Sequence, residues 1–257
     1  PLIETVTLGH LGDRFDRYGH IRMWGSIGFI VSVIGLGYLL DWFSIRVLLW
    51  AILLYMLSVF VLSYRVPDAS VPKHDSLHDS IWQIIRQRHV VALLVACFSM
   101  SAAHGVYYTF YSIYLVNHGY SKAQVGWLWA LGVICEILIF LIMPKLSKRF
   151  SLKYILLVTL LIAFIRFNLI GWAVGIGVVV LLAQALHAAT FGAYHASAVA
   201  LTHQYFKGQH QSKGQGLYTS ISYGVGGTFG GLVSGYAWEA VGPQWTFSIS
   251  ALMALLG

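Results

Sequence analysis

The residues of this chain that could bind a polar molecule or carry a proton are ionisable side chains inside long apolar runs. The clearest is Arg166, in the stretch VTLLIAFIRFNLIGW at 158–172, where Asn168 is the only other strongly polar side chain. An ionisable residue in hydrocarbon costs roughly 2.5–3.5 kcal/mol on insertion scales, and such residues usually mark substrate or proton pathways. The site candidates of this kind are His104, Glu136, Arg166, His187 and His195, with Glu4 and Arg22 nearer the ends of their runs.

An aromatic stripe accompanies His104. Tyr107, Tyr108 and Tyr111 follow it at i+3, i+4 and i+7, and these positions share one face of a helix. The stripe could line a wet cavity that binds substrate, or it could be a tyrosine-rich contact between helices with a satisfied histidine. For His104 alone the two interpretations are balanced, and the whole set of polar residues favours the cavity.

A polar seam surrounds His187 in the same way. Gln184 at i−3, Thr190 at i+3 and Tyr194 at i+7 share its helix face, and His195 lies beside that face. Such residues are poor neighbours for lipid, so the spacing favours a seam that faces the protein interior and contributes to substrate and proton binding. The alternative is that one histidine only hydrogen-bonds a neighbouring helix.

Glu136 is the deep carboxyl group, in the stretch ALGVICEILIFLI with Gly132 one turn before it. Desolvation disfavours its charged form, whereas a nearby arginine favours that form. A group balanced between these effects can bind and release a proton. The competing interpretation is a static ion pair between Glu136 and an arginine that holds two helices together.

The composition explains why these residues must lie on membrane helices. Of 257 residues, 58% are hydrophobic and 10% charged, with mean hydropathy +0.73, whereas soluble domains carry about 25% charged residues. Apolar stretches fall at 23–40, 46–64, 89–116, 124–143, 154–172, 174–203 and 215–238. Their lengths predict an all-α membrane protein with seven full spans, because only helices or closed barrels satisfy the backbone in hydrocarbon. Partial helices are expected at both ends, at 1–9 and from 244 onward.

The basic residues predict the orientation. All sixteen Lys and Arg except Arg46, Lys122 and Arg166 fall on one side when the loops are assigned alternately, and the positive-inside rule makes that side cytoplasmic. The longest polar stretch, at 65–88, lies on the same side and separates two sets of helices. The net charge of +7 therefore needs no nucleic-acid partner.

Other classes of site have no sequence support. Cys97 and Cys135 both lie in apolar runs, and the sequence has no metal-ligand spacing, phosphate-binding Gly-Lys loop or Gly-x-Ser-x-Gly elbow. We expect no metal, no cofactor and no enzymatic activity. The glycine cluster GVGGTFGGLVSGY at 224–236 has small residues at intervals of four, which predicts close helix packing.

Two stretches resemble the proton symporters of the major facilitator superfamily. YGHIRMWGSIGFI at 18–30 is similar to the entry into the fifth helix of the lactose permease-like and phenylpropionate permease-like branch, and HGVYYTFYSIYLVNHGYSKAQVGWLWALGVICEILIF at 104–140 is similar to the seventh and eighth helices of the phenylpropionate type. The resemblance implies a partial major facilitator bundle from late in helix 4 to helix 12. Residues 1–64 would then end the N-terminal bundle, 65–88 would be the central loop, and 89–257 would form the C-terminal bundle.

The resemblance also assigns roles. Glu4 and Arg22 match an acid and an arginine that grip the sugar in the lactose permease, and Glu136, Arg166 and His187 match its acid, arginine and histidine of helices 8, 9 and 10. Three positions depart from that permease. They are Thr190 in place of its proton-carrying glutamate, Gln184 in place of a lysine and His104 in place of an aspartate.

Together these features predict a secondary transporter in the inner (plasma) membrane that cotransports a proton with a small organic solute by alternating access. The resemblance implies an aromatic carboxylate of the phenylpropionate type. A nucleoside or an oligosaccharide is the alternative solute, and a non-transporting membrane receptor is the alternative of another class.

Overall fold

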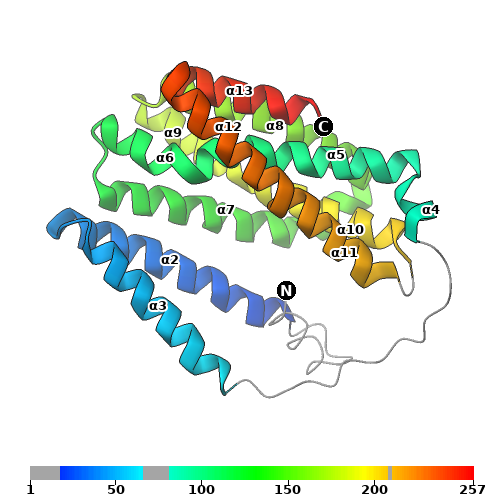
Figure 1. The fold of residues 1–257 in the computed structure, drawn as a ribbon, viewed down its shortest axis with the longest axis horizontal. Coiled ribbons are helices and arrows are strands. Elements are labelled where there is room, and N and C mark those ends of the chain that lie inside the picture. Colours follow the sequence, from blue (N-terminus) through cyan, green and yellow to red (C-terminus); the bar gives the residue numbers. More distant parts are fainter. Residues whose placement is uncertain (1–17, 66–80, 208–209) are drawn as a thin grey trace. The chain divides into compact units, whose positions relative to one another are not determined.

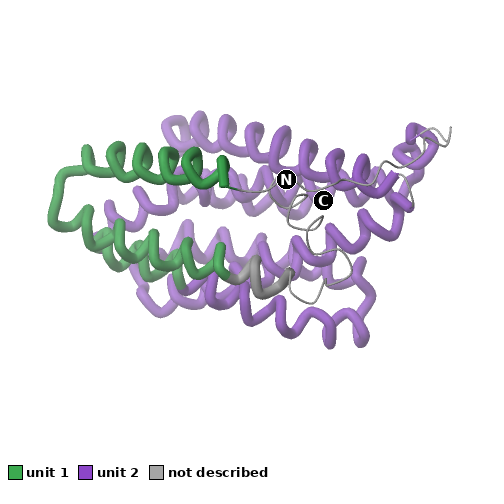
Figure 2. Tube along the Cα trace, turned by 90° about the horizontal axis from the view of Figure 1, so that it is seen from below, with its two compact units in different colours: residues 1–75, 121–130 green, residues 76–120, 131–257 purple. Residues whose placement is uncertain are grey.

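The computed structural model describes residues 18–65, 81–207 and 210–257. Glu4, the predicted helix remnant at 1–9 and most of the 65–88 loop lie outside these residues. The chain divides into two compact units, residues 1–75 with 121–130 and residues 76–120 with 131–257 (Figure 2). The division at 65–88 expected from the sequence stays a prediction.

Unit 1 contains a helical hairpin and the beginning of a third helix. The hairpin is formed by α2 (Tyr18–Trp42) and α3 (Val47–Ser63), and α7 (Lys122–Arg149) contributes its first turns. Asp41 caps α7, because its two carboxylate oxygens accept the backbone N–H groups of Lys122 and Ala123 at 2.8 and 2.9 Å. Gly126 of α7 packs against the backbone of α2 at Val33.

Unit 2 contains the remaining described helices and the rest of α7 (Figure 1). In chain order they are α4 (Ile81–Ile85), α5 (Arg88–Ala103), α6 (Gly105–Asn117), α8 (Leu152–Ala173), α9 (Gly177–Ala185), η2 (Ala188–Ala193), α10 (Tyr194–Tyr205), α11 (Gln211–Thr219), η4 (Ser220–Gly226), α12 (Gly227–Ala240) and α13 (Pro243–Leu255). Local signals fix several helix starts. The Ser151 hydroxyl caps α8, and Pro243 occupies the first turn of α13.

Five helical segments within the described residues are long and apolar enough to cross a membrane. They are Trp24–Trp42, Arg88–Asn117, Lys122–Arg149, Leu152–Ala173 and Gly177–Tyr205, and Val47–Ser63 is a shorter apolar helix. The predicted span at 215–238 is a continuous helical run formed by α11, η4 and α12. The all-α prediction is confirmed, and each of the seven predicted stretches falls on helix.

Four predicted helices differ in detail from the expectation. His104 interrupts the first of them, between α5 and α6, although the backbone N–H of Tyr108 still donates to the His104 carbonyl at 3.0 Å. Two others change from α to π geometry, in η2 and in η4. The helix α7 also continues through Pro144 to Arg149, beyond the end of the predicted stretch at 124–143.

The small residues of the glycine cluster form two rows, one of Gly226, Gly230 and Ser234 and the other of Gly227, Gly231 and Gly235, and the cluster packs through the first row. Gly226 and Gly230 lie against the backbone of α5 at Phe98 and Ala102. In the other row, a Cβ added at Gly227 or Gly231 would meet no atom of the described residues within 4 Å. Close packing is therefore a property of the Gly226 and Gly230 row.

Candidate functional site

Arg166 lies at the centre of a buried polar cluster in unit 2, and its side chain is 0% exposed. Its Nε donates to the carbonyl of Ala183 at 2.8 Å. One terminal nitrogen donates to Gln184 Oε1 at 3.3 Å, and the other donates to Thr190 Oγ1 at 3.2 Å and lies 3.5 Å from His104 Nε2. The guanidinium on α8 is thus held by groups of α9 and η2 and by His104, which lies between α5 and α6.

Aromatic rings cover the faces of the guanidinium. The Tyr107 ring centroid lies 4.2 Å from the Arg166 guanidinium carbon, and the Phe167 centroid lies 5.3 Å away. The Tyr107 hydroxyl also donates to Gln184 Oε1 at 3.1 Å. Cation–π contact in a desolvated site contributes about 2 kcal/mol, so these rings help to hold the charge in place.

The polar contacts of Arg166 described above go to neutral acceptors. His104 belongs to this set because its Nδ1 lies 2.8 Å from the carbonyl of Met100, which can only accept. That bond places the ring proton on Nδ1 and leaves Nε2 as an acceptor for Arg166. A carboxylate in this cluster would meet a positive charge that the neighbouring carbonyl, amide, hydroxyl and imidazole groups solvate but do not neutralise.

His187 faces the same cluster through its ring. Its side chain is 5% exposed, and among the described residues its Nδ1 has no hydrogen-bond partner. The ring lies 5.5 Å from the Tyr107 ring and stacks on Phe191 at 5.3 Å with an interplanar angle of 16°. Buried polar atoms are normally hydrogen-bonded, so this nitrogen is a position where a ligand or a water molecule would find a partner.

Glu136 lies on the side of α7 that packs against η2. A Cβ added at Gly192 would be 3.2 Å from the Glu136 Cγ. One turn earlier on α7, a Cβ at Gly132 would be 3.3 Å from the His187 ring and 3.5 Å from the Gln184 amide nitrogen. The glycines therefore allow a close approach of the two helices that brings the half-buried carboxyl group beside the polar cluster.

The three tyrosines of the predicted stripe do not share one environment. Tyr107 and Tyr111 are fully buried, with ring centroids 4.7 Å apart. Tyr108 is 53% exposed, and its ring lies 5.7 Å from that of His104. Adjacent helical residues point about 100° apart, so Tyr108 lines the edge of the cluster while Tyr107 contacts the guanidinium.

Tyr194 belongs to a different buried cluster. Its hydroxyl lies 3.2 Å from the Ser222 hydroxyl and donates to the carbonyl of Cys97 at 3.2 Å, and Ser222 lies 2.8 Å from Ser101 Oγ. The predicted seam from His187 to Tyr194 assumed α-helical spacing. The π-helix η2 lies between them, and its wider turn rotates the following residues about the axis.

His195 takes the place on that face which was expected for Tyr194. Phe191 stacks on His187 on one side and on His195 on the other, the second pair at 6.0 Å with an interplanar angle of 7°. His195 Nδ1 lies 3.0 Å from the hydroxyls of both Tyr218 and Tyr223. Helical spacing does not predict these two tyrosines, because it relates only residues on the same helix.

Two predicted residues are not placed by the structure. Glu4 lies outside the described residues, and Arg22 belongs to the helical backbone of α2, with its side chain outside the described part. In the part of the chain that the structure describes, no three His, Cys, Asp or Glu side chains form a group that could hold a metal ion.

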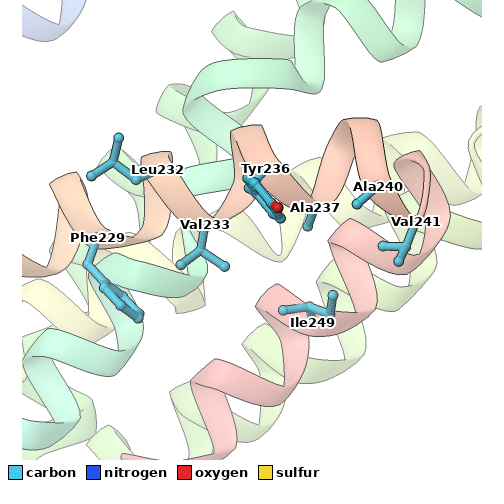
Figure 3. Close-up of a pocket in the computed structure, with 8 residues that line it drawn as sticks. All are labelled: Phe229, Leu232, Val233, Tyr236, Ala237, Ala240, Val241 and Ile249. Carbon is cyan, nitrogen blue, oxygen red and sulfur yellow. The ribbon is translucent and has the colours of Figure 1, made fainter.

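An apolar groove of about 620 Å³ lies between α12 and α13 of unit 2 (Figure 3). Phe229, Leu232, Tyr236 and Ile249 are among the side chains that line it, and no predicted site residue does. An apolar groove on a membrane-spanning helix suits hydrocarbon chains. The chemistry-bearing residues lie in the Arg166 cluster instead.

Comparisons with known proteins agree with this architecture. The MFS_1 like family matches residues 1–249. The chain is 28% identical over 246 residues to the "Probable 3-phenylpropionic acid transporter" of Escherichia coli (strain K12), covering 93% of this chain and 63% of that protein. It is 24% identical to the maltose permease of Geobacillus stearothermophilus, covering 100% of this chain and 66% of that protein.

A solved structure shows the same fold. The nucleoside transporter NupG (D323A mutant) superposes with a TM-score of 0.80 at 19% identity, covering 99% of this chain and 70% of that one. The chain spans just under two thirds of the length of the two curated relatives. Because the family match extends over residues 1–249, this chain belongs to the MFS_1 like family of the major facilitator superfamily, as a multi-pass protein of the inner membrane.

Proposed function

We propose that this protein is a secondary transporter that cotransports a proton with a small aromatic carboxylate by alternating access. The relatives named above are transporters and permeases, which supports transport as the activity. The name of the first relative supports an aromatic acid of the 3-phenylpropionate type as the solute. Binding near the membrane midplane, between two helical bundles, is the usual arrangement in such folds.

The observation that carries the proposal is the environment of Arg166. The guanidinium is fully buried, permanently charged and bonded to the neutral acceptors of Ala183, Gln184 and Thr190. Its planar donors match the two oxygens of a carboxylate, and such charge-assisted pairs are about twice as strong as neutral hydrogen bonds. A solute carboxylate would supply the opposite charge and the bidentate geometry together.

The rings around the guanidinium support an aromatic solute. Tyr107, Phe167, His187 and Phe191 surround the cluster with ring faces and edges. Aromatic pairs gain about 0.5–1.5 kcal/mol beyond area burial when they meet offset or edge to face. A phenyl ring attached to the carboxylate would meet these faces when the carboxylate reaches Arg166.

The proposed proton carrier is Glu136, assisted by His187 or His195. Thr190 stands where the lactose permease has its proton-carrying glutamate, and a hydroxyl cannot titrate in the physiological range. Glu136 lies against η2, beside the helix that carries both histidines. When Glu136 is protonated, Arg166 is the more strongly attracted to the carboxylate of the solute, so proton binding and solute binding favour each other.

Substitution of Arg166 tests the proposal. Lysine keeps the charge but loses the planar fork, so Arg166→Lys should weaken binding of 3-phenylpropionate by about 1–3 kcal/mol, the range for hydrogen bonds to charged groups. Binding of the corresponding amide should change much less. Equilibrium binding to the purified protein measures both, with Arg149→Lys at the end of α7 as the matched control.

Equal losses for the acid and the amide would contradict this role. If Glu136→Gln/Arg166→Gln were also more stable than Arg166→Gln alone, Arg166 would be a structural ion-pair partner. A nucleoside or oligosaccharide that bound more tightly than the acid would then make the alternative solute the better candidate.

A further inference from the structure

A second cluster of titratable side chains lies where α10, α11 and η4 meet. His195 Nδ1 is 3.0 Å from the Tyr218 hydroxyl and 3.0 Å from the Tyr223 hydroxyl, and the two hydroxyls are 3.4 Å apart. The Tyr218 side chain is 2% exposed, whereas Tyr223 is 39% exposed. The three groups therefore converge at one point that can be approached from the Tyr223 side.

The hydrogen bonds of this cluster depend on the protonation of His195. A neutral ring with its proton on Nε2 has one lone pair on Nδ1, which accepts a hydrogen from one of the two hydroxyls. An imidazolium has no lone pair on Nδ1, so neither tyrosine can donate to the ring, and the hydroxyl that donated to it can turn its hydrogen to another acceptor. Protonation thus converts the cluster into a cation flanked by two donors, which suits a carboxylate.

The cluster is connected to the Arg166 site by an aromatic row. The rings of His187, Phe191 and His195 stack in sequence, since the π-turns of η2 place them on one helix face. Titratable groups on the surrounding elements include Glu136 on α7, Cys97 on α5, Tyr108 on α6 and Tyr194 on α10, with His203 and Lys213 further along α10 and α11. His195 is the residue whose ring nitrogen lies within hydrogen-bond distance of both the Tyr218 and the Tyr223 hydroxyl.

We propose that His195, Tyr218 and Tyr223 form a second binding subsite for the carboxylate of the solute, which is complete only when His195 carries a proton. The proton binds the lone pair of the ring nitrogen, and no covalent bond of the solute changes. One residue then binds the proton and helps to bind the solute. This inference rests on the proposed function, from which it takes the carboxylate as ligand.

Equilibrium binding at two pH values tests the subsite. Purified full chain is titrated with 3-phenylpropionate at about pH 5.5 and about pH 8.5, on either side of the usual histidine pKa of about 6.5. We expect Tyr218→Phe/Tyr223→Phe, which keeps both rings, to lose about tenfold in affinity at the lower pH, the scale of a hydrogen bond to a charged group. At the higher pH it should match the unsubstituted protein, and the control Tyr205→Phe should match it at both.

Two further variants keep the test decisive if the double substitution does not fold. Tyr223→Phe alone changes a half-exposed hydroxyl, and His195→Gln keeps a polar side chain that cannot be protonated. Both should reduce the dependence of affinity on pH for the acid and leave binding of the amide unchanged. An unchanged pH dependence in these variants, or a pH-independent unsubstituted protein, would overturn the subsite.

The same data separate this inference from the proposed function. If proton-driven uptake persists in every Arg166 and Glu136 variant, the proposed coupling is refuted. The binding profiles of the His195 and tyrosine variants would still decide whether the subsite exists. Normal uptake with unchanged binding profiles in those variants would refute the subsite alone.

Discussion

At the scale of single residues, the central feature is a permanent positive charge in a fully buried position. Removing a charge from water costs several kcal/mol unless other groups solvate it. Hydrogen bonds to the Ala183 carbonyl, Gln184 and Thr190 and the contact with the Tyr107 ring offset part of the desolvation cost of Arg166. These groups hold the guanidinium in one orientation, which is what recognition of a planar carboxylate requires.

The corresponding prediction concerns Glu136. Glutamine has the same shape but cannot bind a proton, so Glu136→Gln should reduce proton-driven uptake to the level of empty liposomes. Exchange of labelled for unlabelled solute between the vesicle interior and the medium should continue, because exchange needs no net proton movement. Uptake and exchange in proteoliposomes measure both quantities.

The matched control is Glu239→Gln, which changes an exposed carboxyl group near the end of α12. It should behave like the unsubstituted protein in both assays. If Glu136→Gln still accumulated solute against its gradient, the coupled proton would have to bind at another residue.

Residue types and spacing could predict part of this site. Their position in apolar runs predicts Arg166, His104, Gln184 and Thr190 as site residues, and the structure places them in one cluster. Their mutual contacts could not be predicted without knowing which helices pack together. For the same reason the contacts of Tyr218 and Tyr223 with His195 could not be predicted, because these residues lie on different helices and spacing relates only residues of one helix.

At the scale of elements, the two π-helices decide which side chains face each other. A turn of π-helix contains more residues than an α-turn, so it shifts the face on which later side chains lie. Beyond η2, this shift aligns His195 rather than Tyr194 with His187 and Phe191. The length of the apolar stretch predicts a helix over 174–203 but does not show where its hydrogen bonds change from the α to the π pattern.

The prediction at this scale uses the two glycine rows of the 224–236 cluster. A Cβ at Gly230 would clash with the backbone of Ala102, which cannot move aside as a flexible side chain could. Gly230→Ala should therefore destabilise the protein by about 1–3 kcal/mol, the usual cost of overpacking. Thermal unfolding in detergent should show a clearly lower Tm.

Gly231→Ala provides the control on the same stretch of helix. A Cβ there meets no atom of the described residues within 4 Å, and alanine favours helix over glycine by about 0.5–1 kcal/mol. We expect an unchanged or slightly higher Tm. Equal effects of the two substitutions would show that the Gly226 and Gly230 row is not the packing surface.

At the scale of the whole molecule, composition determines the class of fold more strongly than any motif does. A chain with 58% hydrophobic and 10% charged residues must satisfy its backbone polar groups in helices or a closed barrel to cross a membrane, and stretches of about twenty apolar residues favour helices. Run lengths then predict where the helices lie, and each of the seven predicted stretches falls on helix in the described part of the chain. The resemblance of 18–30 and 104–140 supplied the superfamily, since hydropathy alone cannot distinguish one helical membrane fold from another.

The measurement that tests the central claim most directly is uptake of labelled 3-phenylpropionate by proteoliposomes with an imposed pH gradient. An aromatic acid also crosses bilayers unaided in its neutral form, so the informative quantity is the initial rate above that of empty liposomes. The account predicts a protein-dependent rate that increases when the outside is acidic, falls when a protonophore collapses the gradient, and is lost in Arg166→Gln. A protein-dependent initial rate that is the same with and without the pH gradient, or binding without any protein-dependent uptake, would contradict proton-coupled transport.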